Sequence, residues 1–177
     1  LILGCDGGLY ASYDRGQTWD FHDIMAIGQF YDVAVDTRKP YRVYGGLQDN
    51  GSWGGPSRTR GRYGPSNADW YRVGGADGFV CHVDPDDPDL VYYEAQFGKI
   101  GRVNVRTGER ASIRPKAEKD TRYRFNWRTP FTLSTHNSRI LYCAGNFVFR
   151  SLDRGNDLRR ISPEIHYRNG SWSARLL

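Results

Sequence analysis

Short apolar runs, separated by turns rich in glycine, proline and aspartate, extend along most of the chain. Runs of this length bounded by such turns predict β-strands, because the turn residues end each run. Two successive units of the pattern predict strands at 31–35, 42–47, 52–53, 70–73, 80–83, 90–95, 100–105 and 111–114. No stretch has the apolar period of a long amphipathic helix. The pattern therefore predicts an all-β chain.

One feature of this pattern repeats at a nearly constant interval. The segments Val33–Asp36, Cys81–Asp84 and Phe131–Ser134 each end in a polar residue, and a second apolar run follows each at the same spacing. They start at positions 33, 81 and 131, which gives a period of 48 and then 50 residues. Such a period is typical of β-propeller blades, each of which is a four-stranded antiparallel sheet. We therefore expect an incomplete β-propeller.

The period also divides the chain into units. The expected units are a partial blade at 1–23, blades at 24–74, 75–115 and 123–163, and a lead to the next blade at 164–177. Together they make about three and a half blades, whereas closed propellers contain roughly 4–8. The expected partners are therefore the remaining blades of the same polypeptide.

Two turn motifs stand between predicted strands. The first fits the pattern S-x-D-x-G-x-T-W through Ser12, Asp14, Gly16, Thr18 and Trp19. The second is a degenerate copy that keeps Ser151, Asp153 and Gly155. An aspartate can accept hydrogen bonds from turn amides, and glycine can adopt a positive φ. We expect both motifs to hold hairpins rather than to perform catalysis.

These motifs are the signature of the Asp box, and the chain resembles bacterial Asp-box (BNR-like) repeat β-propeller proteins, relatives of sortilin-type and xyloglucanase-type propellers. The other matching stretches are Gly45–Gly51, Gly74–Phe79, Val83–Pro88, Arg124–Pro130 and Phe149–Gly155. The resemblance implies a secreted or periplasmic protein. It is specific for the repeat fold and not for one activity. The chain departs from the pattern at an inserted Ala76 and in the second box, which lacks the Thr-Trp pair.

Propeller geometry predicts a candidate site at one end of the sheets. Aligning the repeats places an amide side chain at the same position in each unit, at Gln48, Gln96 and Asn146. The other candidates for ligand binding in these loops are Asp49, Asn50, Trp53, Asp77, Asn126 and Trp127. Tryptophan could stack on a carbohydrate or peptide ligand, and the amides could hydrogen bond to it. Alternatively, these polar groups satisfy turn backbone and a water-filled channel.

Catalysis at this end would require two carboxylates. A glycoside hydrolase needs them about 5–9.5 Å apart. The candidate pairs are Asp77 with Asp49 and Asp77 with Asp32. A ligand-binding segment and a xyloglucanase- or sialidase-like glycoside hydrolase therefore both remain possible functions.

Charge and composition narrow the functional classes further. The net charge of +5 comes from 25 basic and 20 acidic residues of interleaved sign. The basic run Arg58–Arg62 lies in a glycine-rich stretch and is interpreted as a solvated loop, so we expect no nucleic-acid partner. The three cysteines and four histidines lack metal-ligand spacing, and we expect neither metal nor cofactor. No apolar run reaches the ~18 residues of a membrane span.

Overall fold

The computed structural model describes residues 1–5, 8–22, 28–168 and 171–174, and within them the chain is built almost entirely from β-strands. One short 3-10 helix, η1 (Asn67–Asp69), interrupts the strands. No helix in these ranges is long and apolar enough to cross a membrane. The all-β class predicted from the sequence is confirmed.

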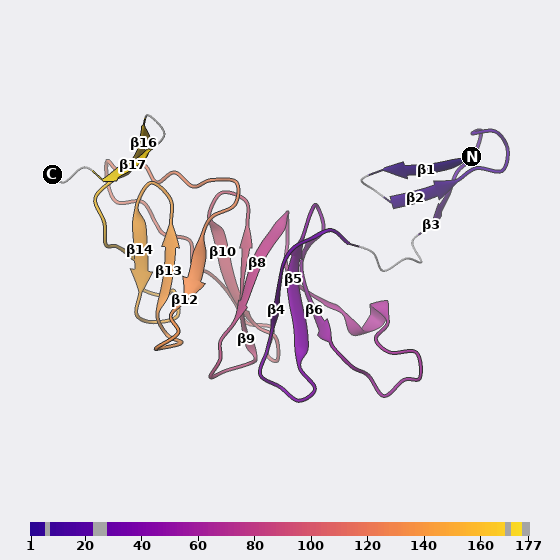
Figure 1. Cartoon of the computed structure of the whole chain (residues 1–177), viewed down its shortest axis with the longest axis horizontal. Coiled ribbons are helices and arrows are strands. Elements are labelled where there is room, and N and C mark those ends of the chain that lie inside the picture. Colours follow the sequence, from indigo (N-terminus) through magenta and orange to yellow (C-terminus); the bar gives the residue numbers. More distant parts are fainter. Residues whose placement is uncertain (6–7, 23–27, 169–170, 175–177) are drawn as a thin grey trace.

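Three four-stranded antiparallel sheets form the body of the structure (Figure 1). The first contains β4 (Phe30–Val35), β5 (Arg42–Leu47), β6 (Gly51–Pro56) and β7 (Tyr71–Gly74). The second contains β8 (Gly78–Val83), β9 (Leu90–Ala95), β10 (Lys99–Asn104) and β11 (Arg110–Ser112). The third contains β12 (Phe131–Leu133), β13 (Leu141–Ala144), β14 (Val148–Ser151) and β15 (Arg159–Arg160). In each sheet every strand pairs with its neighbour in the chain, as the repeat predicts.

Further strands precede and follow these sheets. A three-stranded sheet contains β1 (Ile2–Cys5), β2 (Gly8–Ala11) and β3 (Asp20–His22), and a hairpin contains β16 (Ile165–Arg168) and β17 (Ser171–Ala174). The predicted boundary between residues 23 and 24 lies outside the described residues, as do 169–170 and 175–177 of the predicted lead to a next blade.

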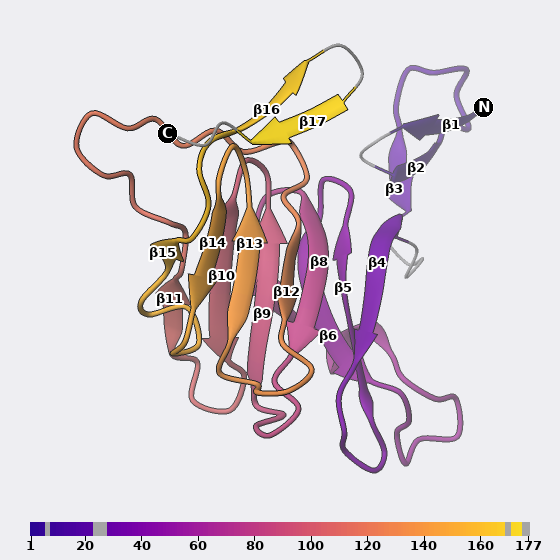
Figure 2. The ribbon, with the colours of Figure 1, turned by 60° about the vertical axis from the view of Figure 1, so that its left-hand side comes forward.

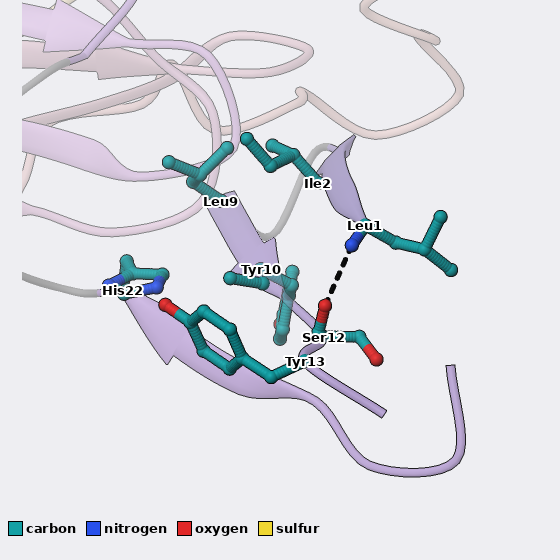
Figure 3. A pocket seen from close by; sticks show the side chains of 8 residues that line it. Leu1, Ile2, Leu9, Tyr10, Ser12, Tyr13 and His22 are labelled. Carbon is teal, nitrogen blue, oxygen red and sulfur yellow. Dashed lines mark hydrogen bonds between the residues drawn. The ribbon is translucent and has the colours of Figure 1, made fainter. Parts of the chain in front are cut away.

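The three-stranded sheet has an apolar surface that remains open to solvent. A cavity of about 320 Å³ opens on it, lined by Leu1, Ile2 and Leu9 among others (Figure 3). The side chain of Ile2 is 80% exposed. Exposed apolar side chains gathered on one sheet surface are typical of a surface that another element covers.

Apolar side chains hold the three larger sheets together in pairs. Tyr44 and Val73 of the first sheet pack with Val91 and Val103 of the second. A second cluster joins the second sheet to the third, and its buried members are Tyr92, Ile100, Ile113, Phe131, Leu141, Cys143, Phe147 and Phe149. Burying one large apolar side chain contributes about 1.5–3 kcal/mol. Most of the buried apolar side chains of the described residues lie in these two clusters.

The antiparallel order of the strands sorts the loops into two ends, which Figure 2 shows at the top and the bottom of the sheets. We call the end that carries residues 48–50, 75–77 and 96–98 the Asp77 end. The opposite end carries the loop 152–158 between β14 and β15, and we call it the Asp-box end.

Ion pairs connect neighbouring sheets at the Asp-box end. Arg38 of the first sheet contacts Asp36 and, in the second sheet, Asp89. Arg154 of the third sheet lies 2.9 Å from Asp84 of the second. The side chains of Asp36 and Asp84 are fully buried, so these contacts are less screened than ordinary surface pairs.

Candidate functional site

The carboxylate of Asp77 is the centre of a hydrogen-bond network at the Asp77 end. Its Oδ1 accepts hydrogen bonds from the backbone N–H of Asp49 at 2.7 Å and from Nε2 of Gln48 at 3.3 Å. Its Oδ2 accepts one from Nε2 of Gln96, and Tyr31 donates its hydroxyl to Gln48. The structure thus brings together four predicted site residues, Gln48, Asp49, Asp77 and Gln96, from three different loops.

The backbone around Asp77 is strained at three positions. Asp49, Ala76 and Phe97 have φ values of 59°, 60° and 57°. Non-glycine side chains rarely adopt this left-handed region, because the Cβ atom crowds the following carbonyl. The Ala76 insertion noted in the sequence is one of the three. Strained residues cluster at functional sites when the surrounding contacts hold them in place, as the Asp77 network does here.

An aromatic pair stands exposed beside this network. The rings of Phe97 and Trp127 lie 5.2 Å apart in an edge-to-face arrangement, and their side chains are 50% and 47% exposed. The backbone N–H of Phe97 donates to the carbonyl of Trp127 at 3.2 Å. Behind them, the buried Phe79 contacts Trp127 and Tyr31 at 6.1 and 4.7 Å between ring centroids. The pair is therefore a supported platform that faces solvent.

The three candidate catalytic carboxylates have different surroundings. Both oxygens of Asp77 accept hydrogen bonds from protein donors, and the side chain is buried. Asp32 is partly exposed and forms an ion pair with Arg128 at 3.4 Å, while its Oδ1 accepts from the Val33 N–H. Asp49 reaches Asp77 through its backbone N–H. This arrangement gives Asp77 a positioning role.

Some of the remaining predicted binding residues lie at the Asp77 end, and others make hydrogen bonds within their own loops. Trp53 donates its indole N–H to the carbonyl of Asn50 at 2.7 Å. Asn126 is exposed next to Trp127, and its carbonyl accepts from the Thr129 hydroxyl. Asn146 is buried and lies apart from the Asp77 contacts: its Oδ1 accepts from the Arg124 N–H at 2.8 Å. Asn146 therefore holds its own loop.

The first Asp box forms the turn between β2 and β3. The carboxylate of Asp14 accepts from the N–H of Thr18 at 2.9 Å and from its hydroxyl at 2.6 Å, while Ser12 accepts from the N–H of Gly16 at 2.7 Å. The Thr18 hydrogen bonds lower the pKa of Asp14 to about 2. Trp19 remains 41% exposed. The side chains of Asp14 and Ser12 thus stabilise this turn.

The second Asp box forms the same turn with a different carboxylate. Ser151 again accepts from a glycine N–H, that of Gly155 at 2.8 Å. The turn amides of Leu152 and Asp153, however, donate to Asp157, at 3.0 and 3.1 Å. The side chain of Asp153 instead pairs with Arg139 at 2.8 Å. Asp157 thus holds the turn in place of the Asp153 carboxylate.

Two residues at the Asp77 end, Phe97 and Glu94, were not among the candidates expected from the sequence. Phe97 completes the aromatic platform, and its position before a glycine in a predicted turn was the available signal. Glu94 of β9 is fully buried, with Oε1 accepting from the Thr129 N–H. Burial raises the pKa of Glu94 to about 7, against the lowering effect of the N–H groups of Thr129 and Val80. Nothing in the sequence marks Glu94 as buried.

Within the part of the chain that the structure describes, no group of three or more histidine, cysteine or acidic residues could hold a metal ion. Cys81 and Cys143 are buried free thiols, and burial raises the pKa of each to about 12.

Comparison with models of known protein families gives no match, and no curated protein matches the chain. The geometry of the site therefore carries the functional argument.

Proposed function

We propose that the chain is a segment of an Asp-box β-propeller whose Asp77 end binds a carbohydrate. The repeated four-stranded sheets support the blade arrangement, as does the packing of the first strands β4 and β8 against each other. In this proposal, further blades of the same polypeptide complete the ring, and the protein acts outside the cytoplasm, as its resemblance to secreted and periplasmic propellers implies.

The observation that carries the binding proposal is the exposed pair of Phe97 and Trp127. Two large aromatic side chains held half exposed on a fixed backbone are a stacking surface for the apolar faces of sugar rings. Asn126, exposed beside them, makes no side-chain hydrogen bond within the described residues and can bond to sugar hydroxyls.

The contacts of the candidate carboxylates favour ligand binding without hydrolysis. A general acid or base must exchange a proton with the substrate, and both oxygens of Asp77 already accept hydrogen bonds from the protein. Asp32 is paired with Arg128. The glycoside hydrolase alternative is therefore not part of this proposal.

Isothermal titration calorimetry with a xyloglucan heptasaccharide tests the proposal on the whole 177-residue chain. We expect Trp127→Ala to weaken binding about tenfold, because the stacking contact is lost. The matched control is Tyr63→Ala, which removes a 92% exposed aromatic residue from the loop before η1. Absence of binding, or equal affinity in Trp127→Ala, would contradict the proposal.

A further inference from the structure

A second cavity lies beside the Asp77 end, between the first and second sheets. It has a volume of about 590 Å³, within the range of about 300–1,000 Å³ common for small-molecule sites. Tyr93, Ala95 and Gly101 of the second sheet line one side, and Gly75 and Ala76 line the other. The last strand of the first sheet, β7, ends at Gly74, directly before these two residues.

The charged side chains that line this cavity are all basic. They are Lys99, Arg110 and Arg114. Arg72 adds another guanidinium beside the cavity, with Nη2 3.4 Å from the place where a Cβ atom of Gly75 would lie. Asp77 comes directly after the lining residue Ala76, but its carboxylate oxygens accept hydrogen bonds from Gln48, Asp49 and Gln96.

Two of the guanidinium groups are held in place without being neutralised. Arg110 donates to the carbonyls of Val73 and Arg72 in the first sheet, the latter at 3.1 Å. Arg114 lies over the ring of Phe125, 5.4 Å from its centroid. Among the described residues, none of the ion pairs involves these two arginines. Uncompensated cations around one concavity repel one another, and an anion relieves that repulsion.

We propose that this cavity binds the oxyanion group of a small molecule: a carboxylate, sulfate or phosphate. Guanidinium groups recognise these groups through paired N–H donors, and fixing the arginines beforehand lowers the ordering cost of binding. The Ser112 hydroxyl and the wall formed by Tyr93 and Gly101 are available to the uncharged part of the ligand. This site is separate from the aromatic platform and does not depend on the function proposed above.

Calorimetry with glucose, glucuronate, glucose 6-sulfate and glucose 6-phosphate tests this site and identifies which oxyanion it prefers. We expect at least one of the anions to bind at least tenfold more tightly than glucose. The double substitution Lys99→Gln with Arg114→Gln should weaken anion binding about tenfold or more. These two positions are chosen because Arg110 also joins the two sheets and its loss could disturb the fold.

The matched control is Arg58→Gln with Arg60→Gln, which removes the same amount of charge from an exposed loop. Retained affinity in this control, together with loss in the cavity variant and unchanged far-UV circular dichroism in both, supports the site. Equal weakening in the two variants would show only general electrostatic attraction and overturn the proposal. Absence of binding by all three anions, or glucose binding as tightly as they do, would overturn it as well.

Discussion

Replacing Asp77 by alanine tests whether this carboxylate organises the loops of the Asp77 end. The substitution removes the acceptor for the Asp49 N–H and for the Gln48 and Gln96 amides. Each donor left without a partner in a buried place costs about 1–3 kcal/mol. The costs are not additive among neighbours, and water can reach the partly exposed glutamines. We therefore expect the free energy of unfolding to fall by about 2–4 kcal/mol.

Asp77→Asn separates hydrogen bonding from charge. The asparagine oxygen can still accept from the Asp49 N–H, and the Gln96 amide can turn over so that its oxygen accepts from the new NH2 group. This substitution should therefore cost only about 1 kcal/mol.

Urea unfolding followed by far-UV circular dichroism measures both changes, since a lower midpoint at constant slope reports lost stability. Asp86→Ala is the control, because Asp86 is exposed and should change stability by less than about 0.5 kcal/mol. If Asp77→Ala is no more destabilising than Asp86→Ala, Asp77 does not hold these loops together.

Three further predictions follow from the buried groups and the second turn. The raised pKa of Glu94 means that the folded chain keeps a proton between about pH 4.5 and 7 that the unfolded chain releases. Stability should therefore fall by about 3 kcal/mol as pH rises through this window, and Glu94→Gln should remove the fall in urea titrations at pH 5 and 8. Asp157→Ala should lower the free energy of unfolding by about 1–2 kcal/mol and Asp153→Ala by less, because only Asp157 accepts from the turn amides. A thiol reagent should modify only the exposed Cys5 in the folded chain and the two buried thiols after unfolding.

Each of these predictions has a contradicting result. A Glu94→Gln variant with the same pH dependence as the original chain would assign the titration to another group. Equal losses for Asp153→Ala and Asp157→Ala would remove the distinction between the two carboxylates. Rapid modification of Cys81 or Cys143 before unfolding, measured by mass spectrometry, would show that their strands open.

The sequence predicts the strands closely where local signals and burial agree. The bounds of β5 and β9 equal the predicted ranges 42–47 and 90–95, because Pro40 and the turn at 85–89 delimit compact apolar runs. Gln48 and Gln96 were expected at one end through the repeat, and the structure brings both to Asp77. That Asp77 is their common acceptor depends on contacts between sheets, which local patterns do not encode.

Other features follow from tertiary packing alone. Glu94 is the one charged residue in the run Leu90–Ala95, yet it is fully buried, and the N–H of Thr129 in the loop before β12 donates to its carboxylate. Asp157 lies outside the motif position at which a turn aspartate was expected, but the same backbone turn brings its carboxylate to the amides. The loop therefore keeps its backbone conformation, and a different side chain accepts the hydrogen bonds of its N–H groups.

The contacts that join neighbouring sheets differ in charge between the two ends, so dissolved salt affects the two ends differently. At the Asp-box end, Arg38 and Arg154 reach across to carboxylates of the second sheet. At the Asp77 end, amide and hydroxyl groups of Gln48, Gln96 and Tyr31 make the corresponding contacts. Dissolved salt weakens attraction between charges and has much less effect on neutral hydrogen bonds. Of these contacts, rising ionic strength therefore weakens mainly the ion pairs at the Asp-box end, and only modestly, because the carboxylates of Asp36 and Asp84 are buried.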